Sequence, residues 1–144
     1  MTNSSLRTLS LELEAVERTV KGFSMTQWHV ARLEPGNQGP DVLELQLYMT
    51  ERLAYRHNLS SERPRLFVRC SENQSEHQSK ANAITASQEV AAGWMDGDWL
   101  VLDATMPLAI QVWLEAYLAR HGEAPDEGRK KKRKGAGRAR EDQA

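Results

Sequence analysis

Histidine and cysteine are the residue types in this chain that could bind a metal or act as a nucleophile. There are four histidines and one cysteine: His29, His57, Cys70, His77 and His121. No two histidines have the short spacing of a metal site, so ordinary surface or sheet positions are favoured. Arg69 could favour a reactive thiolate at Cys70, but a lone cysteine at a strand end is more often a small buried packing residue.

Motifs that mark common active sites do not occur in the sequence. It contains neither of the glycine-rich phosphate-binding patterns nor Gly-x-Ser-x-Gly. The four tryptophans could form a ligand cage, but packing in the core is the favoured explanation. We therefore expect no catalytic residues, no metal and no cofactor.

A polar cluster is the stronger candidate for an interaction surface. Its members are Tyr55, Arg56, Asn58, Arg63 and Arg65. Arginine binds carboxylates through paired hydrogen bonds, so this surface could receive an acidic segment of a partner. The alternative is structural, with the tyrosine in the core, the asparagine holding a turn and the arginines paired with acids of the same domain. We favour the structural interpretation because turn chemistry explains the asparagine without a ligand.

The C-terminal residues form a basic tail. Residues 129–144 hold eight cations and two acids, net +6, whereas the other 128 residues hold 11 cations and 18 acids, net -7. Six cations are consecutive: Arg129, Lys130, Lys131, Lys132, Arg133 and Lys134. Like-charge repulsion predicts a disordered tail that could bind nucleic acid, anionic lipid or an acidic protein surface. Without aromatic residues for base stacking, binding to nucleic acid would be weak and nonspecific.

Length and composition predict one small domain at residues 9–122. A flexible N-terminus, residues 1–8, and a disordered linker and tail, residues 123–144, would flank it. No apolar run approaches the ~20 residues that span a bilayer, and the N-terminus has no apolar stretch typical of a signal peptide. A single cysteine also excludes an intrachain disulfide, so we expect a cytoplasmic protein without a transmembrane segment.

Period-two alternation predicts most of the strands. It is clearest over residues 43–49 and is also present at residues 9–14, where a helix over 6–20 is a rival interpretation. Residues 28–33, 53–59, 66–68 and 99–103 suggest four further strands. The loop between Pro35 and Pro40 and the polar stretch 71–80 separate strands.

Two helices are expected towards the C-terminus. Thr85 or Ser87 can cap the first, which ends near residues 96–98. Thr105 is expected to cap the second, and Gly122 to end it. This second helix has an apolar face at helical spacing, namely Ile110, Trp113, Leu114, Tyr117 and Leu118. The predicted fold is α+β, with an antiparallel sheet of five or six strands covered by helix; a partly open barrel is a variant.

The pattern Glu-x-x-x-Tyr-Arg-x-Asn-Leu-x-Ser-x-x-Pro-x-x-Phe-Val over residues 51–68 resembles an uncharacterised proteobacterial family of unknown function. Further matching pieces are the Leu33-Glu34-Pro35 segment, residues 84–87, the Met106-Pro107 start of the last helix and the basic run. The resemblance spans roughly residues 9–134.

Members of that family are encoded beside genes for molybdenum-dependent formate dehydrogenase. The resemblance thus implies a non-catalytic accessory protein that assists assembly, maturation or regulation of that enzyme, with a dehydrogenase subunit or maturation factor as protein partner. The alternative is a nucleic-acid-associated protein that binds through its basic tail. The resemblance implies no catalytic residues.

Overall fold

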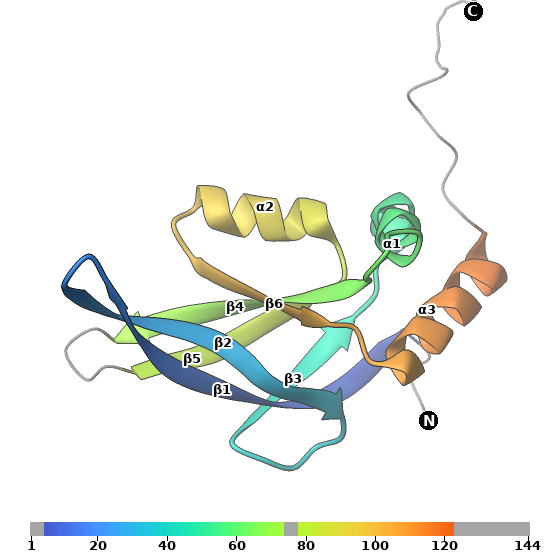
Figure 1. The fold of residues 1–144 in the computed structure, drawn as a ribbon. Coiled ribbons are helices and arrows are strands. Elements are labelled where there is room, and N and C mark those ends of the chain that lie inside the picture. The colour runs from blue at the N-terminus through green and yellow to red at the C-terminus, as the bar shows by residue number, and fades with distance from the viewer. Residues whose placement is uncertain (1–4, 74–77, 123–144) are drawn as a thin grey trace, which may run out of the picture.

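The computed structural model describes residues 5–73 and 78–122, which form two small sheets and three α-helices (Figure 1). The strands are β1 (Leu6–Val20), β2 (Phe23–Pro35), β3 (Asp41–Gln46), β4 (Arg65–Asn73), β5 (Gln78–Thr85) and β6 (Leu100–Thr105). The helices are α1 (Arg52–Leu59), α2 (Gln88–Asp96) and α3 (Leu108–His121), and a 3₁₀ turn, η1 (Met49–Glu51), precedes α1.

The first sheet is antiparallel with the order β2-β1-β3. Its β1 segment is a strand throughout, which confirms the strand interpretation over the helical one. Lys21 and Gly22, with φ of 54° and 84°, form the two-residue turn to β2, the geometry of a type I′ hairpin. Only residues 9–11 of β1 pair on both sides, because β3 pairs with residues 6–11 and β2 with residues 9–20. Leu6–Thr8, assigned from the sequence to the flexible N-terminus, are therefore strand residues.

The second sheet is antiparallel with the order β5-β4-β6. The strands predicted at residues 66–68 and 99–103 are confirmed as parts of β4 and β6. The loop predicted over 71–80 is partly wrong, because Ser71 pairs with Lys80 within the β4–β5 ladder. Backbone pairing needs no apolar side chains, so the polar ends of a hairpin leave no period-two signal. Residues 74–77 lie outside the described residues.

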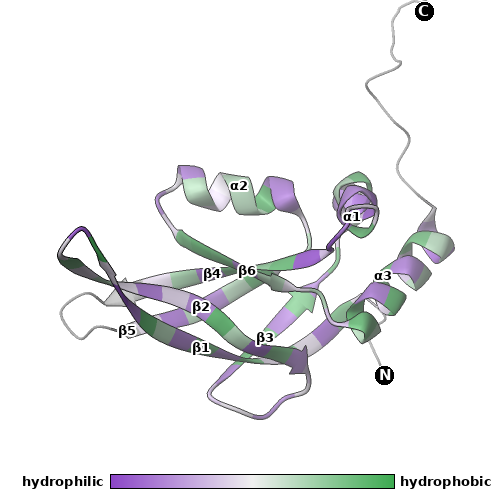
Figure 2. Ribbon diagram, in the orientation of Figure 1, coloured by the Kyte–Doolittle hydropathy of each residue, from purple (hydrophilic) through white to green (hydrophobic). Residues whose placement is uncertain are grey.

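The core lies where the two sheets and α3 face one another. Leu9, Leu11 and Leu45 come from the first sheet, and Leu66 and Val68 from the second, each fully buried. Figure 2 shows hydrophobic and hydrophilic positions alternating along the strands. The strand predicted at 43–49 is confirmed only to Gln46, since Met49 already belongs to η1.

The strand predicted over residues 53–59 is wrong, because this segment is α1. The apparent alternation of Leu53, Tyr55, His57 and Leu59 fails at His57, which is exposed. The buried positions are Ala54, Tyr55 and Asn58, the spacing of one helical face. Leucine, alanine and arginine are good helix formers and gave a local signal for this helix.

The two helices predicted near the C-terminus are present as α2 and α3. Ser87 caps α2, since its hydroxyl accepts a hydrogen bond from the Val90 N–H. The expectation that Thr105 caps α3 is wrong: Thr105 pairs with Arg65 in the β-ladder, and Pro107 occupies the cap position. The predicted apolar face of α3 is buried at all five positions. Gly122, with φ of 78°, stands at its C-cap as expected.

The α+β class is confirmed, but the single sheet of five or six strands is not. The described strands divide into two sheets of three, and they do not close into a barrel. β3 lies beside β5, and β2 beside β6, without a hydrogen-bonded ladder. Alternation along one strand does not specify its neighbours, so the sequence could not distinguish one sheet from two.

Candidate functional site

Asn58, the central residue of the predicted polar cluster, is a buried structural link. Its amide donates hydrogen bonds to the carbonyl oxygens of Arg65 (2.7 Å) and Ala86 (2.9 Å). Its side-chain oxygen accepts one from the Arg65 N–H (3.0 Å). These bonds join the end of α1 to the start of β4 and the end of β5, as the turn interpretation requires.

The hydroxyl group of Tyr55 also has its hydrogen-bond partner inside the protein. Its side chain is 1% exposed, and its hydroxyl accepts a hydrogen bond from the Tyr48 N–H at 3.0 Å. The ring packs edge-on against Tyr117 of α3, with centroids 6.4 Å apart. Burial raises the pKa of Tyr55 to about 12, and the hydrogen bond from Tyr48 opposes this in part. Tyr55 is therefore a neutral core residue at ordinary pH.

Two of the three arginines of the cluster form ion pairs with acids of the same domain. Arg56 of α1 donates two hydrogen bonds to Glu115 of α3, at 2.8 and 3.3 Å. This contact lowers the pKa of the exposed Glu115 carboxyl. Arg65 of β4 donates to Asp103 of β6 at 2.9 Å. Arg63 is exposed and makes no hydrogen bond or ion pair with the described part of the chain.

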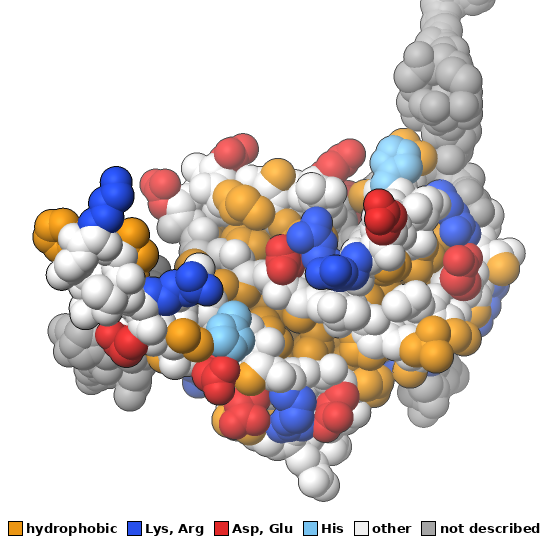
Figure 3. All heavy atoms as spheres, viewed as in Figure 1, with side chains coloured by type: hydrophobic (Ala, Val, Ile, Leu, Met, Phe, Trp, Pro, Cys, Tyr) orange, Lys and Arg blue, Asp and Glu red, His pale blue; other side chains and the backbone are white. Residues whose placement is uncertain are grey.

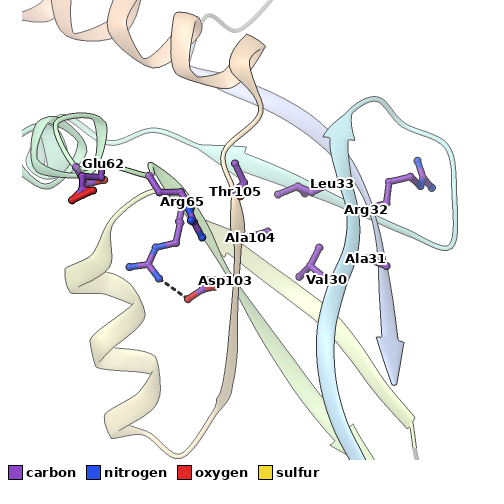
Figure 4. Close-up of a pocket in the computed structure, with 11 residues that line it drawn as sticks. Val30, Ala31, Arg32, Leu33, Glu62, Arg65, Asp103, Ala104 and Thr105 are labelled. Carbon is purple, nitrogen blue, oxygen red and sulfur yellow. Dashed lines mark hydrogen bonds and ion pairs between the residues drawn. The ribbon is translucent and has the colours of Figure 1, made fainter. Parts of the chain in front are cut away.

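An open cavity of about 790 Å³ lies beside Arg63 and Arg65, between the outer strands of the two sheets (Figure 4). We call this cavity the seam. One wall is Val30–Leu33 of β2, the other is residues 103–105 of β6, and residues 61–63 with Arg65 line one end. β2 and β6 are each the outer strand of their sheet on this side. Two sheet edges thus border a solvent-accessible groove.

The arginines of the seam differ in whether they form ion pairs within the domain. Arg32 extends away from the cavity (Figure 4) and forms ion pairs with Glu12 and Glu34. Val30 and Leu33 point from β2 towards β6, which gives that wall an apolar surface. Arg65 is held by Asp103, as the dashed line in Figure 4 marks. Arg63 is therefore the arginine of the seam that no described acid neutralises.

Sequence reasoning identified Arg63 and Arg65 but missed the walls of the seam, which include Arg32. Residues 30–33 and 103–105 lie about 70 positions apart and meet only through the packing of the two sheets. Neither segment carries a local pattern that distinguishes it from any other strand. The single signal was the clustering of Arg63 and Arg65 around one turn.

The cysteine and the histidines were the other candidates for chemistry, and those described next pack or pair within the domain. Cys70 is 1% exposed, which agrees with a packing residue. His29 pairs with Glu14 at 2.6 Å, and His121 packs on Tyr117. His77 lies outside the described residues. Within residues 5–73 and 78–122, no three metal-binding side chains group together.

The tryptophans do not gather into one cage. Trp94 and Trp99 both lie near the Arg69 guanidinium, whose central carbon is 5.3 Å and 4.3 Å from their respective ring centroids. Trp113 is nearly buried, with Arg7 over its ring at 4.8 Å. Trp28 belongs to β2, in the first sheet.

The basic tail predicted at residues 129–134 lies outside the described residues. Among the described helices, none is long and apolar enough to cross a membrane.

Comparison with known proteins gives one match. A family described as "Protein of unknown function (DUF3305)" matches residues 13–134. No curated protein and no solved structure matches the chain. The expected resemblance to a family of unknown function is confirmed at that level.

Proposed function

The chain belongs to the DUF3305 family of proteins of unknown function, and from that premise we propose that it is a non-catalytic accessory protein of a molybdenum-dependent formate dehydrogenase. In this role it binds a dehydrogenase subunit or a maturation factor and assists assembly, maturation or regulation. The link to the dehydrogenase rests on the sequence resemblance alone. The proposed mode of action, binding to another protein, rests on the seam.

The seam supports the proposal because it has the features of a peptide-binding groove. Its walls are two outer strands, and such strands can accept hydrogen bonds from an extended segment of a partner. The apolar side chains of Val30 and Leu33 can contact the partner's alternate side chains. The groove is open to solvent, so a partner can enter without unfolding the domain.

Arg63 favours an acidic segment as the occupant. It is exposed at the end of the groove and has no ion pair with the described residues. A guanidinium group can bind a carboxylate through two parallel hydrogen bonds. Arg65 can contribute to the positive potential, although it already forms an ion pair with Asp103.

The test is an affinity purification from the native host grown with formate and molybdate, using four tagged baits. One bait is the full-length chain, the second lacks residues 129–144, and the third carries Arg63→Glu. The fourth bait, Arg120→Glu, is the matched control, because Arg120 is also exposed and without a described ion pair but lies in the last turn of α3, which does not line the seam. We expect dehydrogenase subunits or maturation factors with the full-length and control baits, and at least about fivefold less with Arg63→Glu.

Two outcomes would contradict the proposal in different ways. Recovery of the same partner with Arg63→Glu would exclude the seam as the binding surface while retaining the pathway. Recovery of nucleic acid and ribosomal proteins alone, lost on deletion of residues 129–144 and on raising the salt concentration, would favour nucleic-acid binding through the tail.

A further inference from the structure

The distal half of the β1–β2 hairpin extends beyond the core and carries a cluster of exposed apolar side chains. In Figure 1 this hairpin projects past the remaining strands, and Figure 3 shows hydrophobic side chains at its far end. The register pairs Val20 with Phe23 and Arg18 with Met25, so these four side chains share a face. Val20, Phe23 and Met25 are 50%, 77% and 55% exposed. Exposed apolar side chains that cluster in this way are typical of an interaction surface.

The outer edge of β2 in this region has no partner strand among the described residues. β2 pairs with β1 alone, and it lies beside β6 only where the seam forms. An unpaired strand edge presents a row of backbone N–H and C=O groups that can pair with another strand. The distal half of β2 is therefore free to accept a ladder.

This edge lacks the residues that normally prevent strand pairing. Residues 23–30 read Phe-Ser-Met-Thr-Gln-Trp-His-Val, without lysine, arginine, aspartate, glutamate, proline or glycine. Exposed edges usually carry a charge, a proline or a bulge. The other outer strands fit this rule, since β3 contains Asp41 and Glu44, β5 contains Lys80 and β6 contains Asp103.

Hairpin geometry indicates which backbone groups point outward. In a two-residue hairpin, the residues that flank the turn form a hydrogen-bonded pair, and such pairs alternate with non-hydrogen-bonded ones along the strands. Val20 and Phe23 flank the turn. Ser24, Thr26 and Trp28 therefore direct their N–H and C=O groups away from β1, towards the free edge.

We propose that two copies of this chain associate through these edges, with the distal halves of β2 paired antiparallel about a two-fold axis. A two-fold axis places each edge against itself, which requires a strand without charges that would repel their own copies. The distal half of β2 meets that requirement, with His29 as its only titratable residue. The joined sheet also places the apolar side chains at Phe23 and Met25 of both copies on one continuous face. The proposal is independent of the proposed function.

The experiment measures the mass of the full-length protein by sedimentation velocity over about a hundredfold range of concentration. We expect a monomer–dimer equilibrium that persists at high salt, because the proposed contact joins backbone groups and apolar side chains and does not depend on ion pairs between the copies. Thr26→Pro removes one outward N–H from each copy while leaving the β1–β2 ladder intact, since edge strands tolerate proline at such positions. It should weaken dimerisation at least about tenfold.

Thr26→Val is the matched control. It also removes the hydroxyl that donates a hydrogen bond to Glu17, but it keeps the N–H and a β-branched side chain. We expect it to dimerise like the original chain. Met25→Lys is a second test that leaves the backbone unchanged, and it should oppose dimerisation by placing like charges on the joined face.

Three results would overturn the proposal. The first is a monomer at every concentration. The second is a dimer unaffected by both Thr26→Pro and Met25→Lys, with circular dichroism showing that both variants are folded. The third is a dimer that dissociates at high salt, which would indicate contact between the basic tail and the acidic body instead.

Discussion

Asn58 joins α1, β4 and β5 at a place that we call the junction. The junction and the distal half of the β1–β2 hairpin differ in whether their backbone polar groups find hydrogen-bond partners within the fold. At the junction, three backbone groups are satisfied by one buried amide, which holds α1, β4 and β5 together. In the hairpin, a full row of backbone groups faces outward, and the apolar side chains beside it are exposed. Both regions are rich in residue types that suggest binding, but only the hairpin leaves them available. A binding surface is therefore distinguished from a structural link by groups that have no partner within the fold, and not by its residue types.

The largest effect is expected at the junction. Replacement of Asn58 by leucine, Asn58→Leu, leaves the Arg65 N–H and the carbonyl groups of Arg65 and Ala86 without partners in a buried site. We expect a loss of about 3 kcal/mol in the free energy of unfolding. Urea denaturation measures it, with Asn82→Ala as control, because Asn82 is exposed and, among the described residues, its side chain bonds only that of Arg69. Equal stability of the two variants would refute the structural role of Asn58.

A smaller effect is expected for Tyr55→Phe. The ring stays in the core, but the Tyr48 N–H loses its acceptor, which should cost about 1 kcal/mol. The original chain should also lose stability as the pH rises. The pKa of Tyr55 in the folded protein, about 12, lies above its ordinary value of 10.0. The stability that the neutral Tyr55 contributes is therefore present below pH 10 and is lost between pH 10 and 12.

Denaturation of both chains across that range of pH tests the prediction. The stability difference between the original chain and Tyr55→Phe should shrink as the pH rises. A difference that stays constant would mean that Tyr55 does not titrate with the raised pKa.

The ion pair between Arg56 and Glu115 should contribute still less. Its carboxylate is about half exposed, so we expect Glu115→Gln to cost at most about 0.5 kcal/mol, and less at high salt. The pKa of Glu115 is lower in the folded protein than its ordinary value of 4.5. The stability contributed by the ion pair is therefore fully present above pH 4.5 and is lost as the pH falls through the pKa of Glu115 in the folded protein. Denaturation at neutral and acidic pH measures it. A cost as large as that of Asn58→Leu would mean that this exposed pair holds α1 in place as strongly as the junction does.

The smallest effect on stability is expected in the hairpin. Phe23 is 77% exposed, so Phe23→Ser should change the unfolding free energy of the monomer by less than about 0.5 kcal/mol. Denaturation at low protein concentration measures this change, and sedimentation at high concentration measures dimerisation. We expect weaker dimerisation without loss of stability. A large loss of stability would show that Phe23 contributes to the fold, and the contrast with the junction would then fail.

Local pattern determined much of this protein in advance. Period-two alternation identified β1, β3 and β4, and helical spacing placed all five buried residues of α3 on one face. Both patterns report burial of one side of a regular element, which depends on neighbours a few positions away. The asparagine turn was also foreseen, because its side chain bonds close to its own position in the chain.

Tertiary structure decided what local pattern could not. At residues 52–59, where the sequence carries signals for both a strand and a helix, packing of one face against α3 selected the helix. Tertiary packing also divided the six described strands into two sheets. It brought Val30–Leu33 and residues 103–105 together as the seam and left the distal edge of β2 without a partner among the described strands. The physical reason is that side-chain period specifies which face of a strand is buried. Which edges meet depends on contacts between segments far apart in sequence.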